Sequence, residues 1–319
     1  MTTEKLNWFR AALQLRGSVA PTVFPRVLLC SGFGFLVSLL YYLGLPVSWH
    51  ILGSVVSNVV FNLVLGLLLV FRTNTAYERF WEGRKKWGTL VVNVRNLGRQ
   101  IWVGVAEIEP ADRGKKVSIL KLLVGFAIAT KLCLQEEPVN SDLEALINPL
   151  QDNNVKCSFA SLQSVKSPPL EVALWIGNYL QQQHNRNCLN SNQLFAMNTL
   201  LDSMVEAYTG CERILKTPIP SSYSIYLKRL LLIYSIALPL QVVDEMGWAT
   251  GLIVALISFI LLGIEEIGNE IENPFGYDPN DLPLDEICNT IIQNIEDLIK
   301  SGSSEAEVQT LQPESISHQ

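Results

Sequence analysis

The sequence predicts an all-α membrane protein with four transmembrane helices per subunit and a helical cytoplasmic part. Hydrophobic side chains make up 49% of the chain and charged ones only 17%, whereas soluble domains carry about a quarter charged residues. Long apolar runs occur as one pair near the N-terminus and a second pair late in the chain. Because no stretch alternates convincingly with period two, strands are not expected.

The first two predicted spans cover residues 27–45 and 51–71. A helix needs about 20 mostly apolar residues to cross a hydrocarbon core about 30 Å thick, and both runs reach that length. The five residues between them, PVSWH, allow only a tight helical hairpin.

The last two predicted spans cover residues 225–243 and 246–264, separated by little more than Asp244 and Glu245. The third is long enough only if Lys228 and Arg229 belong to it and snorkel toward the interface or face protein.

Lysine and arginine gather on one side of these spans. Neither hairpin turn contains a basic residue, so the positive-inside rule places both termini and residues 72–222 in the cytoplasm. The first residues lack the continuous apolar core of a signal peptide. The basic residues are Lys5, Arg10, Arg16, Arg26, Arg72, Arg79, Arg84, Lys85, Lys86, Arg95, Arg99, Lys216, Lys228 and Arg229.

The cytoplasmic part, residues 72–222, is predicted to be helical. Lys121 and Lys131 interrupt the apolar run 117–134, which therefore indicates a buried helix and not a fifth span. Ser191 is a plausible N-cap for an amphipathic helix whose seam repeats in steps of three and four, and residues 142–169 read as loop. The seam residues are Leu194, Met197, Leu201, Met204, Tyr208, Cys211 and Leu215.

The C-terminal segment 265–319 holds thirteen acidic residues and one lysine, which is typical of a solvated tail. Six cysteines show no CxxC spacing and three histidines lie far apart, so no metal site is indicated. No phosphate-binding loop or Ser-His-Asp set appears. We therefore expect a protein that is not an enzyme and uses no cofactor or nucleic acid.

The second apolar run continues into FRTNTAYERFWEGRKKWG (residues 71–88) without a proline, which predicts one helix leaving the bilayer as a rod. This block resembles the bestrophin family of anion channels, in its bacterial and plant-organelle branch. LRGSV (15–19) and IENPFGYDPNDLPLDEIC (271–288) carry the same resemblance. Since it extends over nearly the whole chain, residues 1–319 are interpreted as a single channel domain.

The resemblance implies a homopentamer that passes chloride or other small anions through one central pore. It implies a hydrophobic neck formed by Leu63, Leu67 and Phe71, which at spacing i, i+4, i+8 lie along one helix stripe. A second constriction is implied near residues 192–195, without a fixed register. The alternative to a pore-lining role, for any leucine of this span, is contact with lipid or packing against protein. The basic residues below, Arg72, Arg79, Arg84, Lys85 and Lys86, are interpreted as interfacial anchors and ion pairs.

Two polar features near the pore keep alternatives open. Asn58 and Asn62 are candidates for a wet outer mouth, with interhelical hydrogen bonding as the alternative. Animal relatives bind calcium after Asn-Pro-Phe-Gly, and this chain keeps Asp278 and Asp281 there, with Glu270 as a third oxygen donor. Calcium requires six to eight oxygens, so no metal is expected.

Two other functions are compatible with this topology. An anion transporter or exchanger would predict internal repeats and broken spans, and a membrane-anchored signalling scaffold would predict a separable soluble domain. The sequence leaves open the physiological anion, the gating stimulus, and the membrane. The plasma membrane is one expectation, and a thylakoid membrane is another if the source is photosynthetic.

Overall fold

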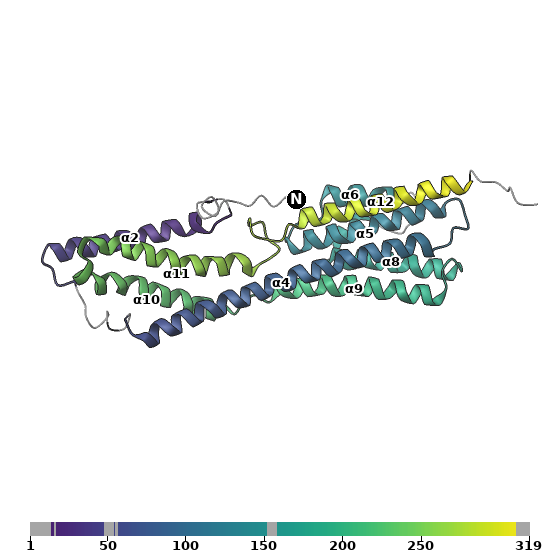
Figure 1. The fold of residues 1–319 in the computed structure, drawn as a ribbon. Helices are drawn as coiled ribbons and strands as arrows, with labels where there is room; N and C mark the ends of the chain where they lie inside the picture. Colours follow the sequence, from purple (N-terminus) through teal and green to yellow (C-terminus); the bar gives the residue numbers. More distant parts are fainter. Residues whose placement is uncertain (1–13, 16, 48–53, 55–56, 152–157, 311–319) are drawn as a thin grey trace, which may run out of the picture. The chain divides into compact units, whose positions relative to one another are not determined.

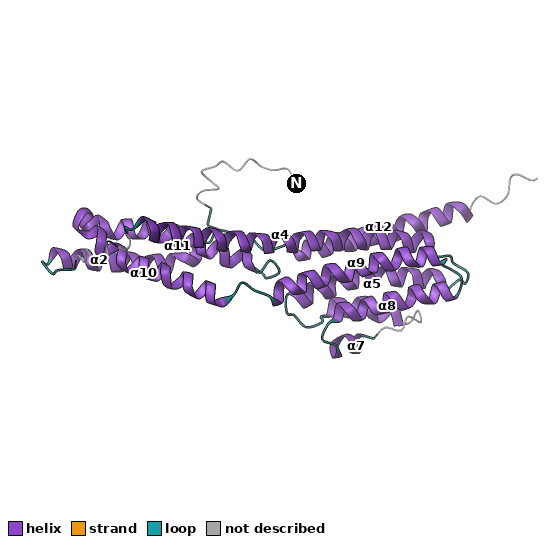
Figure 2. Cartoon of the chain, turned by 90° about the horizontal axis from the view of Figure 1, so that it is seen from below, coloured by secondary structure: helices purple, strands orange, loops and turns teal. Residues whose placement is uncertain are grey.

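The computed structural model describes residues 14–15, 17–47, 54, 57–151 and 158–310. Within these ranges every regular element is a helix (Figure 2), which confirms the all-α prediction. The chain forms two compact units. The first unit comprises Met1–Trp81 with Thr217–Asp281, and the second unit comprises Glu82–Lys216 with Leu282–Gln319.

The first unit contains α2 (Ala20–Tyr42), the start of α4 (Val59–Gly104), α10 (Ser221–Met246) and α11 (Thr250–Glu272), with a 3₁₀ turn at Gly247–Ala249 (Figure 1). α2, α4 and the helical stretch Ser221–Glu272, which comprises α10, the turn and α11, are long and apolar enough to cross a membrane. Their bounds differ from the predicted spans because backbone hydrogen bonding, and not hydropathy alone, decides where a helix starts and stops. α2 starts earlier, with a proline in its first turn as helices prefer.

Small residues bring α2 and α11 into close contact. Ser31 donates to the carbonyl of Gly251 at 3.1 Å, and Ser38 donates to the carbonyl of Gly247 at 3.0 Å. A Cβ added at Gly34 would lie 3.1 Å from the Gly251 Cα. Lipid tails are as apolar as leucine, so burial of leucine does not drive helices together inside a bilayer. Apolar helices there associate through close packing of small residues and through hydrogen bonds.

α4 is a single helix from Val59 to Gly104, as the absence of proline predicts. The predicted span began at residue 51, but residues 51–53 and 55–56 lie outside the described part of the chain. The helix starts after Asn58, whose side-chain oxygen accepts from the Val60 N–H at 2.8 Å. An N-cap of this kind satisfies a backbone donor that the first turn leaves unpaired.

The second unit packs α5 (Asp112–Leu134), α8 (Pro168–Asn185), α9 (Ser191–Lys216) and α12 (Leu284–Thr310) beside the rest of α4 (Figure 1). By length and hydropathy α5 also qualifies as a span, but 78% of its apolar window is buried by protein, against 22–28% for the other candidates. A lipid-facing helix would leave much of its surface uncovered. The structure therefore supports the prediction of a buried helix over residues 117–134.

The loop predicted for residues 142–169 is wrong. α6 (Ser141–Gln151) and α7 (Phe159–Ser164) are helices, and Pro168 already begins α8. The amphipathic pattern was too short to stand out, yet Leu143 and Ile147 are fully buried one turn apart. Pro168 and Pro169 occupy the first turn of α8, where a missing N–H costs nothing.

The cap of α9 was also misassigned. Asn190, and not Ser191, accepts from the Gln193 N–H at 2.8 Å, while Gln193 returns a bond to the Asn190 N–H at 3.0 Å. This reciprocal pair is a capping box. The predicted seam is largely correct, since Met197, Leu201, Met204, Tyr208 and Cys211 are buried in α9.

The interpretation of the acidic C-terminal segment as a solvated tail is wrong for α12. Ile291 and Ile295 are buried, and Asp285 pairs with Lys131 of α5 at 2.7 Å. The acids occupy the outer face of an amphipathic helix, so counting charge without following its period concealed the apolar face.

Candidate functional site

The first part of α4 has two contrasting faces. Leu65 and Leu69 are buried against Leu227 and Leu231 of α10. On the opposite side lie Leu63, Leu67 and Phe71, which are 59%, 45% and 59% exposed. Residues separated by four lie nearly above one another on a helix, so these three form one uncovered apolar stripe, called here the neck stripe. Its role as a pore neck stays a prediction.

The asparagines at the start of α4 make local hydrogen bonds. Asn58 accepts from Val60, and the Asn62 amide donates to the Asn58 carbonyl at 3.2 Å. Both side chains are exposed. Asn58 is therefore a helix cap, a role that hydropathy did not reveal, and whether the pair lines an outer mouth stays a prediction.

Directly below the neck stripe, Arg72 is buried, and both of its terminal nitrogens donate within its own subunit, whereas Nε has no hydrogen-bond partner among the described residues. It donates to Ser224 of α10 at 2.7 Å, to Asn269 of α11 at 2.7 Å, and to Glu272 at 2.8 Å. Burying a guanidinium is costly unless a counter-charge and hydrogen bonds compensate it. The interaction therefore ties α4 to α10 and α11 and does not present a bare charge to a pore.

Glu272 accepts several of the hydrogen bonds that hold these helices together. Besides Arg72, its carboxylate accepts from the Ile219 N–H at 2.9 Å, and its backbone carbonyl accepts from Arg79 at 3.1 Å. Arg79 also donates to the Thr217 carbonyl. The prediction that these arginines are ion pairs and anchors fits this arrangement for Arg72, whose partner lies two hundred residues away. Sequence reasoning did not identify Glu272, although it precedes the Asn-Pro-Phe-Gly motif directly.

The Asn-Pro-Phe-Gly motif builds a tight turn after α11. Phe275 is fully buried, and a Cβ at Gly276 would lie 2.7 Å from Asp281 Oδ2. That oxygen accepts from the Asp278 N–H at 2.8 Å, whereas Asp281 Oδ1 is buried without a hydrogen-bond partner among the described residues. A side chain at position 276 would therefore displace the Asp281 carboxylate.

The carboxylates of this turn disfavour one another's ionisation. Burial raises the pKa of Asp281 to about 6, and the nearby charges of Asp278 and Glu270 act in the same direction. Among the described residues no group of three acidic, histidine or cysteine side chains could hold a metal ion. Calcium requires six to eight oxygens, so the absence of a regulatory metal here stays a prediction.

In the second unit, α9 runs antiparallel to the continuation of α4. Lys86 pairs with Glu206 at 3.1 Å, and Arg213 pairs with Glu82. The first turn of α9 lies instead at the far end, where Gln193 donates to the Gly104 carbonyl at 3.4 Å. At about 1.5 Å per residue, residues 192–195 lie roughly 30 Å along α4 from Glu82. Within that turn Phe195 is strongly exposed.

That far end is closed by a buried ionic network that the sequence did not indicate. Asp112 accepts from Arg186 at 2.8 and 3.0 Å and from the N–H groups of Ile108 and Glu109. The Arg186 guanidinium holds the pKa of Asp112 well below its usual range. Lys116 donates to the Val105 carbonyl at 2.7 Å and so satisfies the end of α4. These charges stabilise helix ends.

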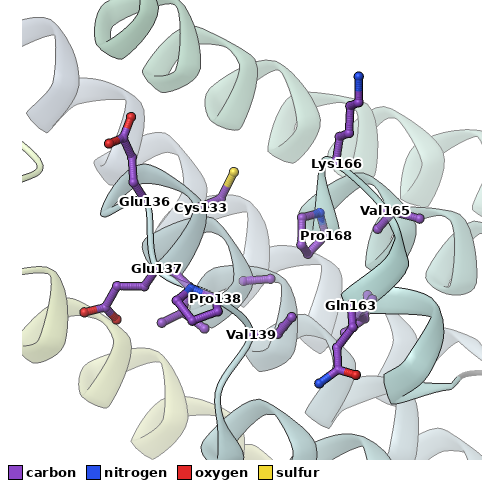
Figure 3. A pocket seen from close by; sticks show the side chains of 12 residues that line it. Cys133, Glu136, Glu137, Pro138, Val139, Gln163, Val165, Lys166 and Pro168 are labelled. Carbon is purple, nitrogen blue, oxygen red and sulfur yellow. The ribbon is translucent and has the colours of Figure 1, made fainter.

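A cavity of about 490 Å³ lies between the turn after α5 and the turn before α8 (Figure 3). The charged ends of Glu136 and Lys166 point away from the space between Pro138 and Pro168. The Cys133 thiol lies 3.4 Å from the Tyr208 hydroxyl, which lies 2.8 Å from the Ser167 hydroxyl. These polar groups therefore join α5, α9 and the start of α8.

Comparisons with known proteins agree over nearly the full length. A family model described as "Bacterial/Fungal Bestrophin protein" matches residues 1–297. A voltage-dependent anion channel-forming protein of Nostoc sp. is 58% identical over 298 residues, covering 93% of this chain and 94% of that protein. A protein of the same description from Synechocystis sp. is 50% identical over 293 residues, with 92% of each covered.

Among solved structures, a bacterial bestrophin homolog from Klebsiella pneumoniae superposes with a TM-score of 0.72 at 27% sequence identity. The match covers 87% of this chain and 98% of that one. The similarity thus extends over both units of the chain and includes α12, which the sequence alone presented as a tail.

Proposed function

This chain belongs to the bacterial/fungal bestrophin family, and on that premise we propose that it forms a passive anion channel. Relatives at 58% and 50% identity over more than nine-tenths of the chain are named as anion channel-forming proteins, and this similarity is the main support. The proposed assembly is a homopentamer with one central pore and both termini in the cytoplasm.

The proposed neck consists of Leu63, Leu67 and Phe71 from five subunits. One observation supports this choice: the stripe is apolar and uncovered, while the opposite face of α4 is packed on α10. Five copies arranged about an axis would stack three apolar rings. Such a constriction conducts while it holds water and closes when a small narrowing dewets it. The neck is therefore a gate more than a filter.

Anion preference in this proposal arises mainly at Phe71. The edge of an aromatic ring carries partial positive charge, so a ring of phenylalanine edges attracts anions without a fixed cation. Arg72 contributes less than its position suggests, because Glu272 pairs with it at 2.8 Å. Weakly hydrated anions should enter most readily, since dehydration dominates the cost in an apolar neck.

The second constriction is proposed at Phe195, the exposed large apolar side chain of the first turn of α9. The first turn of α9 lies roughly 30 Å along α4 from Glu82. This length separates the second constriction from the proposed neck and allows a vestibule between them. A ring of phenylalanine here would repeat the chemistry proposed for Phe71.

The proposal is tested by current recordings from the purified full-length chain in planar bilayers. In a chloride gradient with equal sodium, and then in chloride, nitrate and bicarbonate mixtures, an anion channel reverses near the anion equilibrium potential and shows discrete unitary openings. Reversal near the sodium potential would contradict anion selectivity. Anion flux without unitary events would indicate an exchanger, because alternating access moves far fewer ions per second.

A further inference from the structure

A groove in the first unit is formed by α2, α10 and α11. Its volume is about 390 Å³, and most of its lining is apolar. Three charged residues lie at one end, before the leucines of α2 and α10 and after the leucine of α11. The lining consists of Leu29, Cys30, Leu231, Leu232, Ser235, Leu262, Arg26, Lys228 and Glu265.

At the charged end the acidic side chains are buried and the basic side chains are exposed. The Glu265 side chain is 3% exposed, whereas those of Arg26 and Lys228 are 50% and 59% exposed. Each cation lies 3.8 Å from a Glu265 oxygen, and Arg26 also pairs with the largely buried Glu266 at 2.8 Å. A buried carboxylate needs counter-charge, so both cations are held at the groove. The two acids balance the two cations in charge, and the groups exposed at this edge are the cationic ones.

These cations keep hydrogen-bonding capacity. A separation of 3.8 Å is too long for a hydrogen bond, so Lys228 contacts Glu265 only electrostatically. Arg26 donates through Nη1 alone among the contacts of the described residues. An ammonium has three donors and a guanidinium five. Donors for an anionic oxygen thus border an apolar groove.

We propose that this groove binds one anionic phospholipid, with its phosphate on Arg26 and Lys228 and an acyl chain along Leu29 and Leu232. A phosphate matches the donors, and an acyl chain matches the leucines. Basic sites between membrane helices recognise lipid headgroups in this way. A headgroup without its own cation suits the exposed cations better than choline does. The inference rests on membrane insertion of the first unit, and channel activity is not required for it.

The test is native mass spectrometry of the full-length chain in detergent, titrated with palmitoyl-oleoyl phosphatidylglycerol or the matching phosphatidylcholine. The double variant Arg26→Gln/Lys228→Gln should bind phosphatidylglycerol roughly tenfold more weakly than wild type. The matched control is Arg95→Gln/Arg99→Gln, which removes the same charge from exposed positions of α4 in the second unit. It should bind like wild type.

Two further arms keep the test decisive if the double variant does not fold. Leu232→Trp fills the groove while leaving both cations, and it should also weaken phosphatidylglycerol binding. Glycerol phosphate alone should not compete, because it lacks the acyl chain. Unchanged binding in Leu232→Trp, or full competition by glycerol phosphate, would overturn the proposal. Because the readout is binding, absence of current would count against the proposed function and not against this site.

Discussion

Single residues in this protein handle buried charge in two different ways. Arg72 and Asp112 are each buried against an opposite charge, which joins helices that are distant in sequence, although Arg72 Nε has no hydrogen-bond partner among the described residues. Asp281 instead leaves one oxygen unpaired, and burial raises its pKa to about 6. A raised pKa means that the folded state prefers the protonated carboxyl. Ionised Asp281 therefore destabilises the acidic turn after Asn-Pro-Phe-Gly.

Replacing Asp281 by asparagine should remove this destabilisation at neutral pH. Because the folded pKa lies above the ordinary value of 3.8, Asp281 ionisation lowers stability as pH rises from about 4 to about 6, and the loss persists above that range. After allowance for solvent screening, Asp281→Asn should gain about 1 kcal/mol at pH ~8 and nothing at pH ~4. Thermal unfolding at both pH values measures this difference.

Glu286→Gln serves as the control, since it removes an exposed acid of α12. Its effect on the unfolding midpoint should be small at both pH values. An Asp281→Asn variant that is equally stabilised or destabilised at both pH values would show that this carboxyl does not titrate as the structure indicates.

Residue-level prediction from sequence was limited because contacts decide these roles. The motif around residues 271–288 identified the acidic turn, but the burial of Asp281 and its unpaired oxygen depend on contacts that the sequence does not show. Asn58 was a candidate for an outer pore mouth, which stays a prediction, and its role as the cap of α4 could not be seen from the sequence. Glu272 and Glu265 carried no distinctive signal, because a carboxylate near the end of an apolar run looks the same whether it is paired or solvated.

At the scale of elements, close packing of α2 on α11 depends on which glycine faces the partner. A side chain at Gly34 would meet backbone of α11, whereas nothing lies within 4 Å of a Cβ at Gly32. Both positions lie in the middle of the same helix. Sequence alone shows two glycines in GFG and cannot distinguish the one that packs from the one that does not.

Gly34→Leu should separate α2 from α11 and destabilise the first unit by about 1–3 kcal/mol, the usual cost of overpacking a tight contact. Gly32→Leu should be neutral or slightly stabilising, since leucine is the better helix former. Thermal unfolding of the two variants under identical conditions compares them directly. Equal destabilisation would show that the contact between α2 and α11 is not made as described.

Helices could be predicted where a long stretch of sequence contained no residue that contradicts the assignment. The continuity of α4 follows from an interval without proline, and α5 could be separated from the spans by its lysines. The short helices α6 and α7 were missed because each shows only one or two apolar turns among Asn, Ser and Pro. α12 was missed because the acidic charge of the segment was counted as a whole, although the apolar residues recur at helical spacing.

At the scale of the whole molecule, the pore assignment rests on a choice between similar stripes. Leu252, Leu256 and Ile260 of α11 repeat the i, i+4, i+8 spacing of the neck stripe and are 66%, 62% and 50% exposed. Composition, spacing and exposure in one subunit are therefore nearly the same for both. Family resemblance selects α4, since pore position is a property of the assembly and not of a single chain.

The most direct test of that choice is single-channel recording of two triple-alanine variants. Leu63→Ala/Leu67→Ala/Phe71→Ala should widen and hydrate the neck, so unitary conductance should rise and closures should become rare while pentamers still form by native mass spectrometry. Leu252→Ala/Leu256→Ala/Ile260→Ala removes a comparable apolar stripe and should keep wild-type conductance and gating. Unchanged currents in the first variant, or the same change in both, would contradict a hydrophobic neck built from α4.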